Sequence, residues 1–437
     1  MKVAVIGAGA AGCFCAAELA RLRPDLRITV YEAGTRALAK VAITGGGRCN
    51  LTNTFAGITD LSQAYPRGHR LMNRLFRQFG PEETRRWFED AGVPLVVQDD
   101  QCVFPRSQDA MQIVRTLLAL MRERGVLLRT GHRLVSLQPG LPDDPDGLDK
   151  PGHPEAPGDT AHPDGNRPHT GWRLAFSDGT AAAADIVVVT TGGSPRRSGL
   201  GFLDPLGLTI EAPVPSLFTF RIGDTPLRSL AGTVVKDASC LLAGTRFRAS
   251  GPLLVTDWGL SGPAILKLSS YAARHLAGNG WQGTVVIDWL GDATDRDAAG
   301  LVARLVRGNE RKLLASVRPE FLTGRLWTML LMRAGLREDL RCAELGSKGM
   351  NRLANVLTAD AYPIAGRARF KEEFVTCGGV SLSEINFNTL ESKRFPDLYF
   401  AGEVLDEDAV TGGFNLQAAW SAGWVVAHGI AGRQNGR

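Results

Sequence analysis

The chain opens with two short apolar runs separated by a helix-like stretch. Residues 3–6 and 27–31 are the apolar runs, and the alanine-rich stretch between them covers residues 10–23 without a proline. A run of four to six apolar residues predicts a buried strand, whereas the longer stretch predicts a helix. The first thirty residues are therefore predicted to form a β–α–β unit of a parallel sheet.

Helical spacing of apolar residues returns over residues 66–91, carried by Leu71, Leu75, Phe79, Trp87 and Phe88. Residues 110–124 predict a further helix, and residues 126–129 predict a strand after the stop at Gly125. Residues 132–137 and 172–176 are expected to be the arms of a hairpin, and residues 185–190 a buried strand. Residues 139–170 between the arms are rich in Pro, Gly and Asp and are predicted to be a disordered surface loop.

The pattern changes after Pro213 to short strands and turns. Strands are predicted at residues 217–222, 232–242, 246–248 and 284–290, a helix at 263–276, and a mostly helical region at 298–336. The end of the chain returns to a strand at 398–402 and a helix at 415–430. This predicts an α/β fold in which a Rossmann-type dinucleotide-binding domain, residues 1–208 and 345–437, is split by a β-rich and helical insertion, residues 209–344.

Composition narrows the class of protein. The net charge of +5 comes from 50 basic and 45 acidic residues, which favours a mixed solvated surface but also allows a polyanionic partner. Seven cysteines without paired spacing fit neither a disulfide framework nor a zinc ribbon, so a cytoplasmic protein is expected. His153, His162 and His169 match no metal-ligand spacing, and no metal is expected. No run of 18 apolar residues predicts a membrane helix.

The strongest motif is VAVIGAGAAG, in which Gly7, Gly9 and Gly12 form a GxGxxG sequence between a strand and a helix. Such a turn lets backbone amides approach a pyrophosphate at the start of the helix. Glu32 ends the next strand about twenty residues later, where a carboxylate accepts both ribose hydroxyls of a dinucleotide and disfavours a 2′-phosphate.

Two further glycine-rich segments predict ligand contact. KVAITGGGRCNLTN, residues 40–53, places three consecutive glycines before Arg48, whose guanidinium offers donors for phosphate or a flavin carbonyl. Near the other end, YFAGEVLDEDAVTGGFNLQAAW leads from a strand through Asp406 to a second glycine turn at a helix N-terminus. Two such turns some 400 residues apart suit a long ligand held across a split domain.

These segments, with PLLVTDWGLSGPAIL and TCGGVSLSEINFNTLESK, resemble the signature blocks of the HI0933-like (BaiN-like) NAD(P)/FAD-dependent oxidoreductases, a bacterial family that includes proteins described as aminoacetone oxidase-like. The resemblance implies a glutathione-reductase-like FAD domain built from both chain ends, an inserted β-barrel-like domain and a small helical domain. The residues expected to bind FAD are Gly7, Gly9, Ala10, Ala11, Gly12, Glu32, Lys40, Gly46, Gly47, Arg48, Cys49, Asn50, Asn53, Leu134, Thr191, Gly192, Gly402, Glu403, Asp406, Gly412, Gly413, Asn415 and Leu416.

The sequence departs from the family pattern in two places. The family commonly has Asp-Gly where Asp408 and Ala409 stand, and often a histidine where Asp257 stands. The second difference removes a proton-transfer role that would otherwise be carried over. Asp257 and Glu403 are the acidic groups to test, and no catalytic base is assigned. Cys49 and Cys377 lie in matched motifs without a CxxC partner, so both are interpreted as packing residues.

The sequence therefore predicts an FAD-dependent oxidoreductase that transfers hydride or electrons through flavin N5 to or from a small molecule, with NAD(P)H as a possible transient donor. Two alternatives stay open: an FAD-dependent reductase of uridine in RNA, and a flavin-binding redox sensor without turnover. The RNA alternative requires a basic surface on the insertion, for which the sequence offers Arg221, Arg228, Lys236, Arg246 and Arg248. The substrate and the oligomeric state are not predicted.

Overall fold

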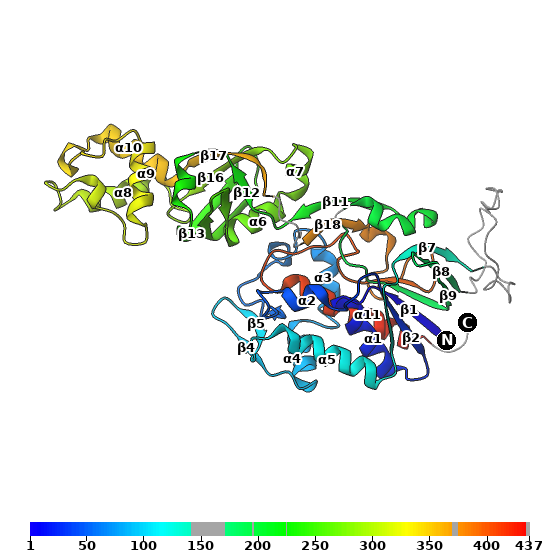
Figure 1. Ribbon diagram of the computed structural model, residues 1–437. Helices are drawn as coiled ribbons and strands as arrows, with labels where there is room; N and C mark the ends of the chain where they lie inside the picture. Colours follow the sequence, from blue (N-terminus) through cyan, green and yellow to red (C-terminus); the bar gives the residue numbers. More distant parts are fainter. Residues whose placement is uncertain (141–170, 195, 224, 369–374, 434–437) are drawn as a thin grey trace. The chain divides into compact units, whose positions relative to one another are not determined.

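The computed structural model describes residues 1–140, 171–194, 196–223, 225–368 and 375–433, and Figure 1 shows its elements. The chain divides into two compact units, residues 1–213 with 378–437 and residues 214–377. Residues 141–170, which hold most of the predicted loop and its three histidines, lie outside the described residues.

The first unit is built on a parallel sheet of five strands. The order β19-β10-β1-β2-β6 puts the N-terminal strand in the centre, with β10 on one side and β2 on the other. The predicted Rossmann-type arrangement is thus confirmed. The inner strand β10 is entirely buried and β1 nearly so, as expected of a parallel sheet covered on both faces, whereas all four residues of the edge strand β6 are exposed. The strands are β1 (Lys2–Ile6), β2 (Arg27–Glu32), β6 (Leu127–Thr130), β10 (Ile186–Val189) and β19 (Leu398–Phe400).

Two helices from opposite ends of the chain pack against each other in this unit. These are α1 (Ala10–Leu22) and α11 (Phe414–Ala431), and α5 (Ala110–Glu123) packs on the other side of α1. A Cβ on Gly423 would lie 2.8 Å from the carbonyl oxygen of Ala11, so the two helices approach closely at the first turn of α1. The C-terminal helix is therefore an integral part of the N-terminal fold.

Two small antiparallel sheets complete the unit. β7 (Leu134–Pro139) pairs with β8 (Trp172–Phe176), which pairs with β9 (Ala181–Ala184), so the predicted hairpin is confirmed. β5 (Cys102–Pro105) lies between β3 (Thr52–Asn53) and β4 (Leu95–Val97), a sheet that the sequence did not predict.

The amphipathic stretch over residues 66–91 forms two helices instead of one. α3 (His69–Leu75) ends before Gly80, and α4 (Pro81–Asp90) begins with proline at its first position. Proline lacks the N–H that a continuous helix would need, whereas at the first turn that N–H has no partner in any case. The short helix α2 (Ala39–Ile43) precedes the triple-glycine segment.

The second unit contains a closed barrel of six strands in the order β12-β15-β14-β13-β16-β17, which confirms the expected barrel-like insertion. α6 (Pro263–Tyr271) packs on β13 and β14, and α7 (Ala273–Gly278) follows it. The single helix expected over residues 263–276 is thus divided at Ala272. The strands are β12 (Phe220–Ile222), β13 (Val234–Leu242), β14 (Arg248–Val255), β15 (Gly259–Ser261), β16 (Gly283–Asp288) and β17 (Asp360–Arg367).

A helical part of the second unit comprises α8 (Asp295–Val306), α9 (Gly324–Arg333) and α10 (Ser347–Thr358). It shares one hydrophobic core with the barrel, including Trp289 and Trp327. The second boundary lies at residue 378 and not at the expected 345, because β17 pairs with β12 and β16 and closes the barrel.

β11 (Ile210–Ser216) and β18 (Val375–Val380), which pair with each other, carry the chain across both boundaries. Within the described ranges, no helix is both long and apolar enough to cross a membrane. Short 3-10 helices occur at η1 (Leu61–Gln63), η2 (Arg197–Leu206), η3 (Pro226–Leu230), η4 (Leu314–Ser316), η5 (Cys342–Glu344) and η6 (Leu382–Glu384).

Candidate functional site

The three glycines of the GxGxxG motif have different structural roles. A Cβ on Gly12 would lie 2.0 Å from the carbonyl oxygen of Gly7, and a Cβ on Gly7 would lie 2.4 Å from that of Thr190. Both glycines are therefore required by the close packing of α1 on the sheet. A Cβ on Gly9, in contrast, would meet no atom of the chain within 4 Å. The space in front of Gly9 is free for a ligand.

The first turn of α1 is suited to an anion. The helix begins at Ala10 directly after Gly9, no side chain caps it, and its first turn contains no acidic residue. Backbone amides at a helix start carry a partial positive charge, which favours phosphate. The open glycine and the uncapped helix together form a cradle of the kind that a pyrophosphate needs.

Glu32 is fixed at the end of β2 beside this cradle. Its Oε2 accepts a hydrogen bond from the amide of Ala8 at 2.8 Å, and its Oε1 accepts one from the amide of Gly34 at 2.7 Å. Each carboxylate oxygen has a second lone pair for a further donor. The predicted contact with ribose hydroxyls stays a prediction that this orientation supports.

The triple-glycine segment lies against the start of α11. Trp420 Nε1 donates to the carbonyl of Leu51 at 3.0 Å, and Thr52 Oγ1 donates to Gln417 Oε1 at 2.5 Å. Asn53 Nδ2 donates to the carbonyl of Gly412 at 3.1 Å. The structure thus brings together two motifs that are about 360 residues apart in the sequence.

Asn50 makes a further connection between these motifs. With its carboxamide oriented so that both groups are satisfied, its Nδ2 donates to the carbonyl of Thr52 at 3.0 Å, and its Oδ1 accepts from the amide of Gly413 at 3.2 Å. A Cβ on Gly413 would lie 2.4 Å from the carbonyl of Thr52, so this position needs glycine. α11 starts just after Gly413, and like α1 it has no side-chain cap and no acidic residue in its first turn.

Arg48 and Cys49 differ in accessibility. Arg48 is exposed, donates from Nε to the carbonyl of Gly45 at 3.1 Å, and lies with its guanidinium 4.6 Å from the centre of the Phe104 ring. The Cys49 thiol is buried, and burial raises its pKa to about 12. The whole residue is 0% exposed, so Cys49 offers no surface to a ligand in this structure, and its interpretation as a packing residue agrees with this burial. A Cβ on Gly46 or Gly47 would meet nothing within 4 Å.

Residues after β19 meet the start of α1. A Cβ on Gly402 would lie 3.1 Å from the Cβ of Ala11, and one on Gly192 would lie 3.8 Å from Glu403 Oε2. The same Glu403 oxygen lies 3.4 Å from Lys40 Nζ. The structure therefore brings these five predicted residues to one edge of the sheet.

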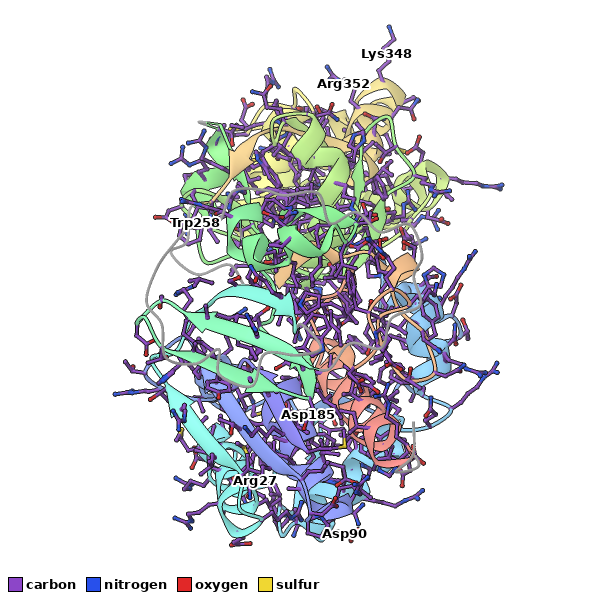
Figure 2. The ribbon with its side chains drawn as sticks, turned by 90° about the vertical axis from the view of Figure 1, so that its right-hand side faces the viewer. Arg27, Asp90, Asp185, Trp258, Lys348 and Arg352 are labelled. Atoms are coloured by element: carbon purple, nitrogen blue, oxygen red, sulfur yellow. The ribbon has the colours of Figure 1, made fainter. Side chains whose placement is uncertain are left out.

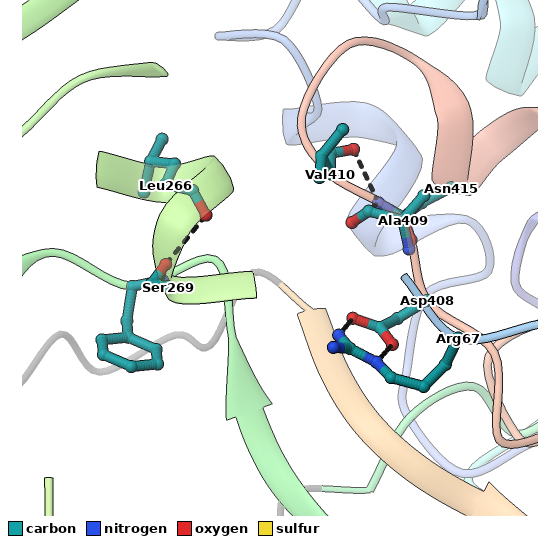
Figure 3. A network of polar contacts seen from close by, with 8 residues as sticks. Arg67, Leu266, Ser269, Asp408, Ala409, Val410 and Asn415 are labelled. Carbon is teal, nitrogen blue, oxygen red and sulfur yellow. Dashed lines mark hydrogen bonds and ion pairs between the residues drawn. The ribbon is translucent and has the colours of Figure 1, made fainter. Parts of the chain in front are cut away.

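The side chain of Asn415 closes its own loop, as Figure 3 shows. Its Oδ1 accepts from the amide of Ala409 at 2.9 Å, and its Nδ2 donates to the carbonyl of Ala409 at 3.1 Å and of Val410 at 3.5 Å. The Asn415 side chain is therefore occupied, and Asn415 would contact a ligand through its backbone amide. The backbone amide of Leu416 is also at the start of α11 and would be used in the same way. Leu134 is buried at the start of β7, and Thr191 is exposed just after β10.

Two acidic residues of the loop between β19 and α11 were not among the predicted site residues. Asp408 is fully buried and forms a two-point ion pair with Arg67, also drawn in Figure 3. Glu407 is 4% exposed, and its Oε2 has no hydrogen-bond partner among the described residues. Burial, with the nearby charges of Asp408, Glu403 and Asp406, raises the pKa of Glu407 to about 8. Three consecutive acids were the only signal in the sequence.

Asp257, the other acidic group proposed from the sequence, belongs to the second unit. Its side chain is exposed, and its carbonyl accepts a hydrogen bond from Arg228 Nε at 2.6 Å. Nothing in its surroundings resembles the buried environment of Glu407. Asp257 therefore stays a candidate on the basis of its motif alone.

Taken together, the open glycines, two uncapped helix starts and a fixed carboxylate fit a long dinucleotide with a pyrophosphate near its centre. The cradle is supplied by both ends of the chain within the first unit.

Comparison with known proteins agrees with this architecture. The family model of the HI0933-like protein Rossmann domain matches residues 1–141, and that of the HI0933-like protein barrel and H2TH domain matches residues 214–375. A 3-dehydro-bile acid delta(4,6)-reductase of Clostridium scindens is 26% identical over 444 residues, covering 99% of each chain. Ribosomal RNA dihydrouridine synthases are 27% identical in Escherichia coli, over 98% of this chain and 97% of theirs, and 26% identical in Haemophilus influenzae, over 98% of each.

Proposed function

Because the chain belongs to the HI0933-like family of FAD-dependent oxidoreductases, we propose that it reduces a carbon–carbon double bond conjugated to a carbonyl group. The names of its relatives describe two such substrates: a 3-dehydro-bile acid with delta(4,6) unsaturation, and uridine that becomes dihydrouridine in ribosomal RNA. In both, the carbonyl withdraws electrons from the double bond, so that hydride adds at its far carbon and a proton follows. This shared chemistry favours a reductase over an oxidase.

The residues of the first unit have distinct tasks in this proposal. Bound FAD supplies hydride transfer at its N5 atom. The amides at the start of α1 hold the pyrophosphate, and Glu32 accepts hydroxyl groups of the adenosine ribose. The amides at the start of α11 stabilise negative charge on the flavin ring, and Arg48 reaches phosphate or a flavin carbonyl.

A reductase also needs an electron donor. The sequence has one dinucleotide-binding fingerprint, at Gly7 to Gly12, and we assign this motif to the binding of FAD. A nicotinamide would therefore bind only transiently, deliver hydride and leave before the acceptor enters. Anaerobic addition of NADH or NADPH to the purified protein tests this step, because reduced flavin loses its absorption near ~450 nm.

The single observation that carries the cofactor assignment is the free space in front of Gly9. Its φ of −83° and ψ of −166° are open to any residue, so Gly9→Val keeps the fold and places a side chain where the pyrophosphate would lie. We expect Gly9→Val to purify without yellow colour and with an unchanged melting temperature. Gly223→Val is the matched control, since a Cβ there also meets no atom within 4 Å.

The outcomes are separable. Wild-type protein that cannot be reconstituted with FAD overturns the cofactor assignment, as does a Gly9→Val variant that retains flavin like the control. Reduced protein that is reoxidised by a 4-ene-3-oxosteroid or by uridine in RNA supports the proposed reaction. Bound flavin that no unsaturated carbonyl compound reoxidises argues against the reaction, although FAD binding would stand.

Reduction of uridine in RNA is the second candidate, favoured by the charge of the second unit. Residues 214–377 contain 22 Lys and Arg against 15 Asp and Glu, whereas the rest of the chain contains 28 against 30. The five residues proposed from the sequence are only partly available. Arg221 donates to the carbonyl of Ala365 at 2.9 Å, and Arg248 pairs with Asp292 at 2.9 Å. Lys236 and Arg246 are exposed and form no ion pair among the described residues, so they stay candidates for an RNA-binding surface on this unit.

A further inference from the structure

The exposed face of α10 carries only polar and basic side chains. Gly349, Leu353, Ala354 and Leu357 are the buried residues of this helix. At the positions between them, a stripe with spacings of three and four residues is exposed, so its members lie on one face. The members of this stripe, which we call the α10 face, are Lys348, Asn351, Arg352 and Asn355.

The cations of the α10 face are not neutralised. α10 contains no Asp or Glu. No carboxylate of the described residues forms an ion pair with Lys348 or Arg352, whereas the nearby Arg337 pairs with Asp339 and Glu344. Figure 2 shows Lys348 and Arg352 extending from the ribbon into open space. Their positive charge is therefore available to a partner.

A groove borders this face. It has a volume of about 370 Å³ and is lined by the end of α9 and by α10, through Arg333, Ala334, Asn351, Arg352, Asn355 and Val356. Arg352 Nη1 reaches to 3.3 Å from the position that a Cβ on Gly335 would take, so this side chain spans from α10 to the turn after α9. Two guanidinium groups and two carboxamides thus face one groove.

Arg333 is held in place by groups behind the groove. Its Nε donates to Asp360 Oδ1 at 2.5 Å, its Nη2 donates to the carbonyl of Ala361 at 3.1 Å, and its guanidinium lies 4.4 Å from the centre of the Tyr362 ring. The buried Asp360 also accepts from Trp289 Nε1 at 3.0 Å. An arginine fixed in this way loses little side-chain entropy when a further acceptor binds.

From this arrangement we infer that the α10 face and its groove bind the sugar–phosphate backbone of RNA. The helical part, residues 295–358, contains 12 Lys and Arg against 7 Asp and Glu, which gives the surrounding surface the same sign of charge. Cations bind phosphates, and asparagine side chains both donate to phosphate and exchange hydrogen bonds with 2′-hydroxyl groups. The inference rests on the second candidate function, reduction of uridine in RNA, and names its binding surface. RNA binding itself does not require flavin, so the two can be tested separately.

An acidic protein segment is the competing partner, and the chemistry of the face disfavours it. The centres of protein interfaces are enriched in aromatic and apolar residues. All four members of the α10 face are polar, and the apolar residues of the groove are the small Ala334 and the half-buried Val356. A polyanion whose charges are spread along a backbone fits such a surface better.

The test measures RNA binding directly. A fluorescent RNA hairpin of defined sequence is titrated with the full-length protein by fluorescence anisotropy, at salt concentrations from about 50 to about 200 mM. We expect binding that weakens with salt and that the double variant Lys348→Glu/Arg352→Glu weakens at least about tenfold at low salt. The slope of log affinity against log salt should decrease by about 1 for each lost cation contact.

Two controls separate this result from trivial causes. Arg27→Glu changes an exposed arginine of the first unit and should leave RNA affinity unchanged. Lys348→Gln/Arg352→Gln removes charge without reversing it and should give a smaller loss in the same direction. Melting temperature and flavin content should be equal in all variants, so that a change in RNA affinity is not caused by unfolding or by loss of the cofactor. The binding assay involves no reduction, so its result does not depend on whether the reductase proposal is correct.

Several outcomes overturn the inference. The inference is wrong if the wild-type protein does not bind the hairpin at low salt. It is also wrong if the double variant binds the hairpin as tightly as the wild type. Polyglutamate that displaces the hairpin at equal charge concentration would assign the face to an acidic protein partner. Arg27→Glu changes the net charge by two and the double variant by four. A loss of log affinity in Arg27→Glu that is about half of that in the double variant would therefore show that net charge alone, and not the α10 face, carries the affinity.

Discussion

Arg67 donates two hydrogen bonds to the fully buried carboxylate of Asp408, one from Nε at 2.5 Å and one from Nη2. The two residues also form an isolated antiparallel bridge through their backbones. This contact joins the chain before α3 to the loop between β19 and α11, which carries several of the predicted FAD-binding residues. A buried carboxylate needs such a partner, because it has no water to solvate it.

Removing Arg67 is expected to destabilise the protein strongly. Arg67→Met leaves Asp408 charged and buried without its main partner, and this should lower the free energy of unfolding by about 3–5 kcal/mol. Urea denaturation followed by circular dichroism measures the change. Arg86→Met, which breaks an exposed pair with Glu82, is the control and should leave the midpoint almost unchanged. Equal effects of the two substitutions would contradict the importance of the buried pair.

Glu407 predicts a stability that falls with rising pH. Its pKa is raised to about 8 by burial, so between about pH 4.5 and 8 the folded protein holds a proton that the unfolded chain has released. The favourable contribution of the neutral carboxyl is complete below about pH 4.5 and is lost as the pH rises to about 8. Glu407→Gln should flatten this dependence and raise the stability above pH 7.

Thermal unfolding across the pH range checks the prediction for Glu407. Glu89→Gln, an exposed change in α4, serves as the control and should keep the wild-type profile. The quantity to compare is the melting temperature of the wild type minus that of Glu407→Gln. If this difference is constant or rises between pH 5 and 8, Glu407 ionises normally and the prediction is wrong.

The hydrogen bonds of Gln417 are expected to support both the stability of the fold and the retention of the cofactor. It accepts from Thr52 Oγ1 and donates from Nε2 to Thr84 Oγ1 and Ser421 Oγ, both at 2.9 Å, in a fully buried position. Gln417→Leu removes a partner from each of these three hydroxyls, although Ser421 Oγ keeps its hydrogen bond to the carbonyl of Phe79, and it should lower the free energy of unfolding by about 1–3 kcal/mol. It should also loosen the triple-glycine segment and reduce flavin retention on gel filtration.

A matched loss of an exposed hydrogen bond is available for comparison. Gln112 accepts from Ser107 Oγ at the surface, and Gln112→Leu should change neither stability nor flavin content appreciably. If Gln417→Leu retained flavin as the wild type does, the packing of residues 45–53 on α11 would not matter for the cofactor.

The parts of the fold that could be predicted are those with local signals. The β1–α1–β2 unit follows from a strand, a glycine turn and a helix within thirty residues, and each is present where expected. The barrel was expected from the pattern of short strands and turns and from the family resemblance. Its closing strand β17 was not expected, because its pairing with β12 joins residues more than 130 positions apart. Because of this pairing, the second boundary between the units lies at residue 378 and not at the expected residue 345.

The same distinction applies to the candidate site. Glycine turns and Glu32 are readable because their spacing carries the chemistry. The burial of Glu407 and the pairing of Asp408 with Arg67 depend on which distant segment covers the loop, and three consecutive acids in a sequence usually indicate a solvated turn. The use of the Asn415 side chain within its own loop could not be distinguished from ligand binding before the backbone was known.

The packing of α11 on α1 and on the triple-glycine segment has a consequence for synthesis on the ribosome. A nascent chain that has not yet reached residues 414–431 contains the GxGxxG turn but lacks the helix that Trp420 and Gln417 use to hold residues 51 and 52. The cradle is therefore completed only after residues 414–431 have been translated. Cofactor capture should follow synthesis of α11, so that products terminated before it remain colourless.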